Sequence, residues 1–258
     1  MTMPALFVGH GNPMNAIQDN QWSKAFQSLS EGVPKPRAVL AISAHYYTQG
    51  THLTGNEDPK TIHDFGGFPP ALYEVQYPVK GDPGLAKRTA DMLRGVGADV
   101  RQDWGIDHGT WSVLRHMYPK ADVPIVQLSI DATAAMETHW QIGEALRPLR
   151  DDGVLIVGSG NITHNLRRAF GKMRTRDTST ESMTIEFDER AARAVEQGDK
   201  DWLVSALDTD AGRDAHPTPD HYLPLVYSAG AGQGDDVSFP VEGFDMGDLS
   251  MRSVRFDA

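Results

Sequence analysis

The chain has 258 residues and a mass of 28.3 kDa, a size that single α/β domains reach, so we expect one domain over residues 1–258. It contains no cysteine, which excludes disulfides, thiolate metal sites and cysteine nucleophiles. The formal net charge of -11 disfavours nucleic acid and anionic membrane surfaces as partners. No apolar run reaches the roughly 18 residues of a membrane span, and residues 5–8 are too short for a signal-peptide core, so we expect a cytoplasmic protein.

Four short apolar runs, each bounded by glycine, proline or polar residues, predict β-strands. In chain order they are residues 5–8, 38–43, 124–129 and 154–159. Helices are predicted at residues 20–30, 83–94, 132–149, 182–197 and 201–207. Asp131 is the expected N-cap of the third helix, and Gly153 is expected to end it.

Strands that alternate with helices predict an α/β fold with a mostly parallel central sheet covered by helices on both faces. The C-terminal region changes character, because its strand patterns have no long helix between them. These patterns lie at residues 237–239, 241–243 and 249–256. We expect them to add antiparallel strands at one edge of the sheet.

Histidines follow three of the four predicted strands. His10 comes just after the first strand, His45 just after the second, and His164 a few residues after the fourth. In an open α/β sheet, the ligand site lies beyond the carboxyl ends of the strands. A single histidine at such a place is more often structural, but three of them together predict a chemical site.

Three further strings with histidine lie between the predicted elements, at residues 63–70, 107–111 and 216–224. The first combines paired glycines with aromatic side chains, which suits a wall over a flat substrate. Taken alone, Asp107 and His108 are typical of a solvated turn. Because loops that follow different parallel strands gather at one sheet edge, we expect residues 63–68 and 107–109 to border the same pocket.

Six strings carry a resemblance to a known family. They are GHGNP at 9–13, SAH at 43–45, TIHDFGGFP at 61–69, DHG at 107–109, GNITHNL at 160–166 and PTPDHYLP at 217–224. Together they resemble the 4,5-DOPA extradiol dioxygenase family of the class III extradiol ring-cleavage superfamily. The strings occur in order over nearly the whole chain, and their combination is specific although each one alone is weak.

The resemblance implies that His10, His45 and His221 hold one divalent metal ion. The wider superfamily uses two histidines and a carboxylate, the facial arrangement of non-haem Fe(II), whereas this chain offers His221 with Asp220 beside it. Imidazoles also suit zinc, so the expected ion is Fe(II) for dioxygenase activity or Zn(II) as bound. His216 is the weaker ligand candidate.

The resemblance further implies that His164 acts as the acid/base, or as a fourth ligand, and that His108 faces the substrate. His63, Phe65, Phe68 and Asp107 are the expected substrate-binding residues. The implied reaction inserts O₂ into a catechol such as DOPA and opens the ring beside the diol. Two alternatives stay open, namely a zinc-dependent hydrolase that uses the same histidines and a non-catalytic protein that binds metal or catechol.

Overall fold

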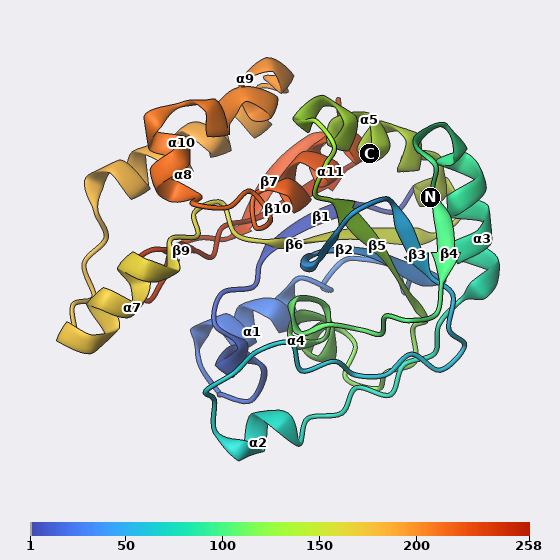
Figure 1. Cartoon of the computed structure of the whole chain (residues 1–258), viewed down its shortest axis with the longest axis horizontal. Coiled ribbons are helices and arrows are strands. Elements are labelled where there is room, and N and C mark those ends of the chain that lie inside the picture. Colours follow the sequence, from blue (N-terminus) through green and yellow to red (C-terminus); the bar gives the residue numbers. More distant parts are fainter. Residues whose placement is uncertain (1) are drawn as a thin grey trace.

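The computed structural model describes residues 2–258 and is built around one eight-stranded sheet (Figure 1). The strands of this sheet lie in the order β4-β3-β5-β2-β6-β1-β10-β7. Their bounds are Ala5–Gly9 (β1), Ala38–Thr48 (β2), His52–Thr54 (β3), Asp99–Arg101 (β4), Ile125–Asp131 (β5), Val154–Gly160 (β6), Asp236–Val241 (β7) and Ser253–Asp257 (β10). Phe244–Asp245 (β8) and Leu249–Ser250 (β9) form a separate antiparallel pair.

The four central strands β5, β2, β6 and β1 are parallel to one another, whereas β10 and β7 are antiparallel and occupy one edge. At the other edge, β3 pairs antiparallel with β5 and parallel with β4. The mostly parallel sheet and the antiparallel C-terminal strands predicted from the sequence are therefore confirmed.

Helices cover both faces of the sheet, as predicted (Figure 1). Their bounds are Gln21–Ser28 (α1), Pro70–Tyr73 (α2), Pro83–Met92 (α3), His108–Met117 (α4), Met136–Leu146 (α5), Pro148–Asp151 (α6), Leu166–Thr175 (α7), Ser182–Glu196 (α8), Lys200–Ser205 (α9), Asp210–Ala215 (α10) and Leu223–Ala231 (α11). Successive side chains of a strand point to opposite faces, so Leu40 packs in the core cluster beneath α5 and α11. Its neighbour Val39 packs in the cluster beneath α1 and α4.

The prediction for the third helix, residues 132–149, is wrong at its start and near its end. Asp131 does not cap the third helix, because its carboxylate accepts from the Thr133 backbone and turns the chain, and α5 begins only at Met136. Pro148 cannot donate a helical hydrogen bond, and it separates α5 from the short α6.

Asp107 does not lie in the solvated turn that it would suggest when taken alone. It is completely buried as the N-cap of α4, where it accepts from the Thr110 backbone.

Helix α11 was not predicted, since its residues are buried on every side and show no amphipathic period. The start of α11 and the residues just before it lie so close to the sheet that a side chain on the facing strand would clash, so glycine is required there. A Cβ atom on Gly160, at the end of β6, would come within 2.1 Å of the His221 carbonyl oxygen. This contact fixes the backbone of His221 beside the carboxyl end of the parallel strands.

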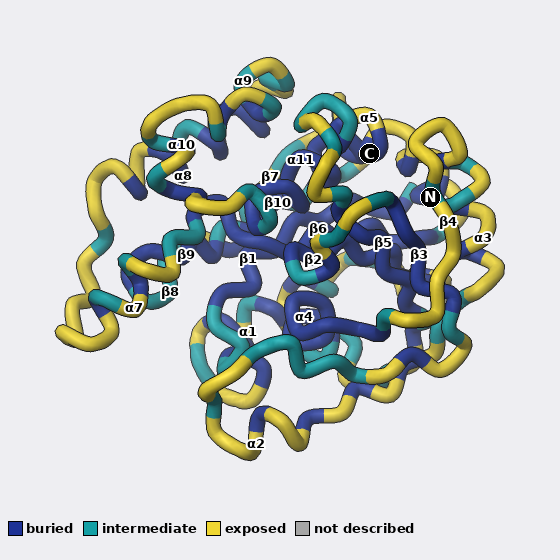
Figure 2. The backbone as a smooth tube through the Cα atoms, viewed as in Figure 1, coloured by how far each residue is buried: buried dark blue, intermediate teal, exposed yellow. Residues whose placement is uncertain are grey.

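Figure 2 contrasts the buried sheet and α11 with α7, which lies at the margin of the molecule. Helix α7 exposes an apolar stripe, since Leu166, Phe170 and Met173 are 41%, 46% and 54% exposed. Among residues 2–258, no helix has the length and apolar character that a membrane span requires.

Candidate active site

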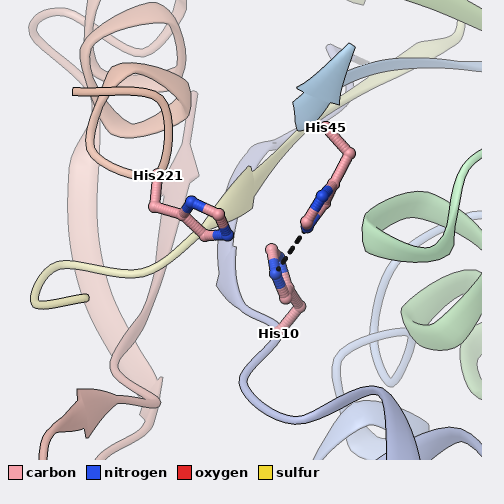
Figure 3. A group of neighbouring side chains, drawn as sticks. All are labelled: His10, His45 and His221. Carbon is pink, nitrogen blue, oxygen red and sulfur yellow. Dashed lines mark hydrogen bonds between the residues drawn. The ribbon is translucent and has the colours of Figure 1, made fainter. Parts of the chain in front are cut away.

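Three histidines from distant parts of the chain meet at the carboxyl ends of the parallel strands (Figure 3). His10 directly follows β1, and His221 precedes α11. His45 lies within β2, where the pairing with β5 is interrupted between Ile42 and Tyr47. Such irregularities redirect side chains toward a site. One ring nitrogen from each histidine lies within 4.8 Å of the other two.

The ring of His10 is held by a chain of hydrogen bonds. Its Nδ1 lies 3.0 Å from the Ser159 Oγ, and that hydroxyl donates to the Gly109 carbonyl oxygen at 2.5 Å. Because the hydroxyl hydrogen is used in this way, Nδ1 of His10 must be the donor. The Nε2 of His10 is then left with its lone pair, 3.3 Å from the Nε2 of His45.

The other two rings are oriented by carboxylates. The Nδ1 of His45 lies 3.1 Å from the Asp64 Oδ2, and the Nδ1 of His221 donates to Asp220. Asp220, whose role the sequence leaves open, therefore pairs with the ring of its neighbour and does not belong to the group of three. Second partners of this kind fix the tautomer and direction of metal-binding imidazoles.

This donor set fits a divalent metal ion. Two facing Nε2 lone pairs repel one another unless a proton or a metal ion lies between them. Burial, followed by the nearby imidazoles, lowers the pKa of His10 and His221 well below the usual range. Both rings are thus neutral, as metal ligation requires.

Asp64 joins two histidines of the site. Its Oδ2 accepts from the Nδ1 of His108 at 2.9 Å as well as from His45, and its Oδ1 accepts from the His108 backbone at 2.9 Å. Burial alone would raise the pKa of Asp64, but the bonds from His108 and His45 lower it well below the usual range. Burial also lowers the pKa of His108, whereas the Asp64 bond raises that of His45 against the effect of burial. A second group of possible metal ligands consists of His45, Asp64 and His108, whose ligand atoms lie within 4.8 Å of one another.

His164 lies beside the group of three and is not part of it. Its ring is stacked on that of His221, with centroids 3.4 Å apart and planes inclined by 6°. Burial, followed by the electrostatic effect of the neighbouring His216, lowers the pKa of His164 to about 3. His216 itself is buried, with its Nε2 2.7 Å from the Ile162 carbonyl oxygen. It therefore lies outside the candidate ligand group.

A cavity of about 240 Å³ opens in front of these histidines. Its lining consists of His10, Gly11, Asn12, Pro13, His45, Asp64, Phe65, Phe68, His108, His164, Leu166, Phe170, His221, Met246 and Leu249. An apolar protein cavity of about 150 Å³ can hold benzene. The space is therefore sufficient for one aromatic ring with a short substituent.

The two loops that the sequence places at one pocket do meet there, through Phe65, Phe68 and His108. Two of the predicted substrate-binding residues lie outside the lining. The Nε2 of His63 bonds to the Val75 carbonyl oxygen at 2.9 Å. Asp107 is turned away from the cavity because its carboxylate accepts from Ser43 at 2.7 Å and from Gln127 at 2.6 Å.

Known proteins are similar to this chain in sequence and in fold. The family described as the catalytic LigB subunit of aromatic ring-opening dioxygenase matches residues 4–256. The chain belongs to this family. A curated protein named 4,5-DOPA dioxygenase extradiol, from Escherichia coli (strain K12), is 45% identical over 98% of this chain and 94% of its own length. One of the same name from Beta vulgaris is 37% identical over 97% and 95%.

The fold is also found in a solved structure. A crystal structure of an uncharacterized protein from Escherichia coli K12 has a TM-score of 0.83 and 39% sequence identity, covering 98% of this chain and 99% of the other. This LigB-family protein is an extradiol aromatic ring-opening dioxygenase. The family and reaction class predicted from the six strings are therefore confirmed.

Sequence reasoning missed two parts of the LigB-family site. Asp64 and Ser159 orient histidines. Asp64 lies within the string at 61–69 but was not assigned a role, and Ser159 lies next to Gly160, the first residue of another string. The apolar side of the cavity, formed by Leu166, Phe170, Met246 and Leu249, was not predicted as part of the site, although Leu166 ends the string at 160–166. Apolar residues on a helix are typical of a core, so the exposure of Leu166 and Phe170 on α7 could not be anticipated.

Proposed function

We propose that this enzyme opens the ring of a catechol such as DOPA with O₂, using one divalent metal ion held by His10, His45 and His221. The carbon–carbon bond beside the diol breaks, and both atoms of O₂ enter the product, a ring-opened semialdehyde with a carboxylate. The catechol itself supplies the electrons that reduce O₂, so no separate reductant is needed. The observation that carries this proposal is the convergence of the three imidazoles at the base of a cavity of aromatic-ring size.

A bound Fe(II) ion would supply the redox centre through which ring electrons reach O₂. The protein residues have separate tasks. A catechol hydroxyl must lose a proton, and the ring of His164, at the cavity wall beside His221, is placed to accept it. Because a group that has accepted a proton can return it, the same ring would also serve as the acid later in the reaction.

His108 and the aromatic residues of the loop after β3 would hold the substrate. With its Nδ1 committed to Asp64, His108 retains its Nε2 for a substrate oxygen. Phe65 lies edge-on to this imidazole, with ring centroids 5.3 Å apart, and Phe68 is edge-on to Phe65. Offset and edge contacts of this kind are favourable for a bound aromatic ring.

The test is to remove metal from the protein, load it with Fe(II) without oxygen, and measure O₂ uptake with catechol and DOPA. We expect one O₂ consumed per ring opened and a new visible chromophore, with activity lost again on chelation. The zinc form is run in parallel on a panel of esters, because an all-imidazole set also suits a zinc hydrolase. Ester cleavage by the zinc form without O₂ uptake by the iron form would contradict the proposal, as would binding of catechol without turnover by either form.

Two further expectations belong to this proposal. The partners are a small-molecule catechol and O₂, without nucleic acid or membrane. A cytoplasmic location stays a prediction, which fractionation of the producing cells would check.

A further inference from the structure

We propose that Arg167, at the rim of the cavity, binds a carboxylate at the end of the substrate's ring substituent, with Arg174 as a second, more distant cation. The inference rests on the proposed catechol cleavage and deepens it, because it names the group that selects among catechols. The substrates that fit are catechols whose carboxylate is separated from the ring by a short carbon chain, as it is in DOPA.

Helix α7 forms part of the rim where the cavity opens to solvent. Leu166 and Phe170 line the cavity and are nevertheless 41% and 46% exposed. They are one helical turn apart, so their side chains lie on the same side of the helix. A ring substituent that leaves the cavity over this side would cover both residues with its carbon atoms, which is favourable.

Helix α7 is strongly basic in an otherwise acidic chain. Residues 166–176 contain five of the 24 lysines and arginines and no acidic residue, although the net charge of the chain is -11. Two of these cations are used within the fold. Arg168 donates to Asp248 at 2.5 Å and to Asp214 at 2.6 Å. The buried Lys172 donates to a carbonyl oxygen of the following loop at 2.8 Å.

Arg167 and Arg174 are exposed, and among residues 2–258 neither guanidinium has a hydrogen-bond or ion-pair partner. Arg167 precedes Phe170 by three residues and Arg174 follows it by four, so both lie beside its side chain on the helix surface. Ala169, on the other side of Phe170, is buried. The two arginines therefore flank the cavity-lining residues on the side that faces solvent.

Arg167 is the nearer of the two cations to the histidines. It follows Leu166 directly and is three residues from His164, and both of these residues line the cavity. Arg174 lies seven residues further along, which is about 10 Å at the rise of an α-helix. A short substituent should therefore pair mainly with Arg167.

The depth of the carboxylate decides whether it finds a cation. No lysine or arginine lines the cavity, whereas Asp64 does. Asp245 places a second carboxylate behind the lining, since its Oδ2 accepts from the Asn12 backbone at 3.2 Å. A carboxylate attached directly to the ring would stay in these surroundings. One at the end of a short chain would reach the rim, keep part of its water and pair with Arg167.

The experiment compares acids with their uncharged amides. The Fe(II)-loaded enzyme is given 3-(3,4-dihydroxyphenyl)propanoate and its amide, and 3,4-dihydroxybenzoate and its amide, and kcat/KM is measured by O₂ uptake. We expect the propanoate to exceed its amide about fivefold at low salt, the upper end for a partly exposed ion pair. Added salt should reduce this advantage, because ions screen exposed charges. The benzoate should have no advantage over its amide.

Three variants locate the effect. Arg167→Gln should lower the acid-to-amide ratio of kcat/KM about three- to fivefold for the propanoate and leave that of the benzoate unchanged. Arg174→Gln should lower the propanoate ratio less. Lys87→Gln is the matched control, because it also removes one exposed positive charge. Lys87 belongs to α3, which lies at the opposite margin of the molecule from α7 (Figure 1), so both ratios should stay unchanged.

The outcomes separate this inference from the proposed function. Calorimetric binding of the four compounds to the zinc-loaded protein should give the same ratios and does not require turnover. An unchanged propanoate ratio in Arg167→Gln would overturn the inference while catechol cleavage stands. Equal falls in Arg167→Gln and Lys87→Gln, or for propanoate and benzoate, would also overturn it, since net charge would then set the preference.

Absence of O₂ uptake with every catechol would overturn the proposed function instead. The calorimetric ratios would then decide whether Arg167 binds the carboxylate, independently of any reaction.

Discussion

The two sides of the cavity are built in opposite ways. On the histidine side, His10 and His221 are 2% and 6% exposed, and each ring is held through Nδ1 by a partner. On the other side, Leu166 and Phe170 are 41% and 46% exposed and belong to a helix at the margin of the fold.

The difference separates chemistry from selection. Ligand and proton-transfer atoms must stay in fixed positions, and burial with directional hydrogen bonds achieves this. A surface that only recognises a substituent needs area and shape, so exposed apolar side chains on a helix are sufficient. Changes on the histidine side should therefore affect turnover and metal affinity, whereas changes at Leu166 and Phe170 should affect substrate preference.

The largest effect is expected for His164→Gln. Removal of the proton acceptor should lower kcat by roughly 10²–10⁴-fold, because general acid–base catalysis typically contributes that much. Metal content should stay near that of the wild type, since His164 lies outside the group of three candidate ligands. Steady-state O₂ uptake and elemental analysis check the two parts. Unchanged kcat would remove His164 from the mechanism, and loss of the metal would instead make it a ligand.

A smaller effect is expected for Asp64→Asn. Asn has only one acceptor oxygen, whereas Asp64 now accepts from two imidazole Nδ1 atoms at Oδ2 and from the His108 backbone at Oδ1, so at least one of these three bonds must be lost. We expect the affinity for the metal to fall by about 10–100-fold, as for other partners of ligating histidines. Competition with a chelator measures it. Asp245→Asn is the control, because Asp245 bonds to Asn12 and Asn15 but not to a ligand of the site. Equal losses in both variants would argue for a general effect of charge.

Gly160→Ala tests how the histidine side is anchored. The new Cβ atom would meet the His221 carbonyl oxygen at 2.1 Å, so that backbone must move. We expect a loss of about 3 kcal/mol in unfolding free energy and weaker metal binding. Gly171→Ala, in α7, has nothing within 4 Å of the new Cβ atom and should stabilise by about 0.5–1 kcal/mol. Chemical denaturation measures both, and tolerance of Gly160→Ala would show that α11 is less closely held.

The last effect concerns stability in acid, away from the cavity. Burial lowers the pKa of His139 to about 4, and its Nδ1 lies 2.8 Å from the Tyr227 hydroxyl. Below about pH 6.5 the unfolded chain binds a proton at this residue while the folded chain does not. This group should therefore reduce the unfolding free energy by up to about 3 kcal/mol between pH 6.5 and 4. Denaturation curves of His139→Gln should show a shallower loss over that interval, and an identical slope would contradict the assignment.

Much of the fold and part of the site could be predicted because their signals are local in the sequence. Buried parallel strands form continuous apolar runs, as in β1 and β6, and the residue after such a strand lies at the ligand edge. This reasoning placed His10 and His45 together. Helix α11 escaped it because a helix that is buried on all sides has no period to detect.

The partners of the histidines were decided only by the tertiary structure. His10 is 149 residues from Ser159, and His108 is 44 residues from Asp64, so no local pattern relates them. The apolar side of the cavity was also decided by the tertiary structure, since Leu166 and Met246 line one cavity only because α7 and the loop after β8 lie together. Sequence determined which chemical groups stand at the strand ends, because strand period and burial are local properties. Packing determined which atoms those groups face, because the contacts that hold them join distant segments.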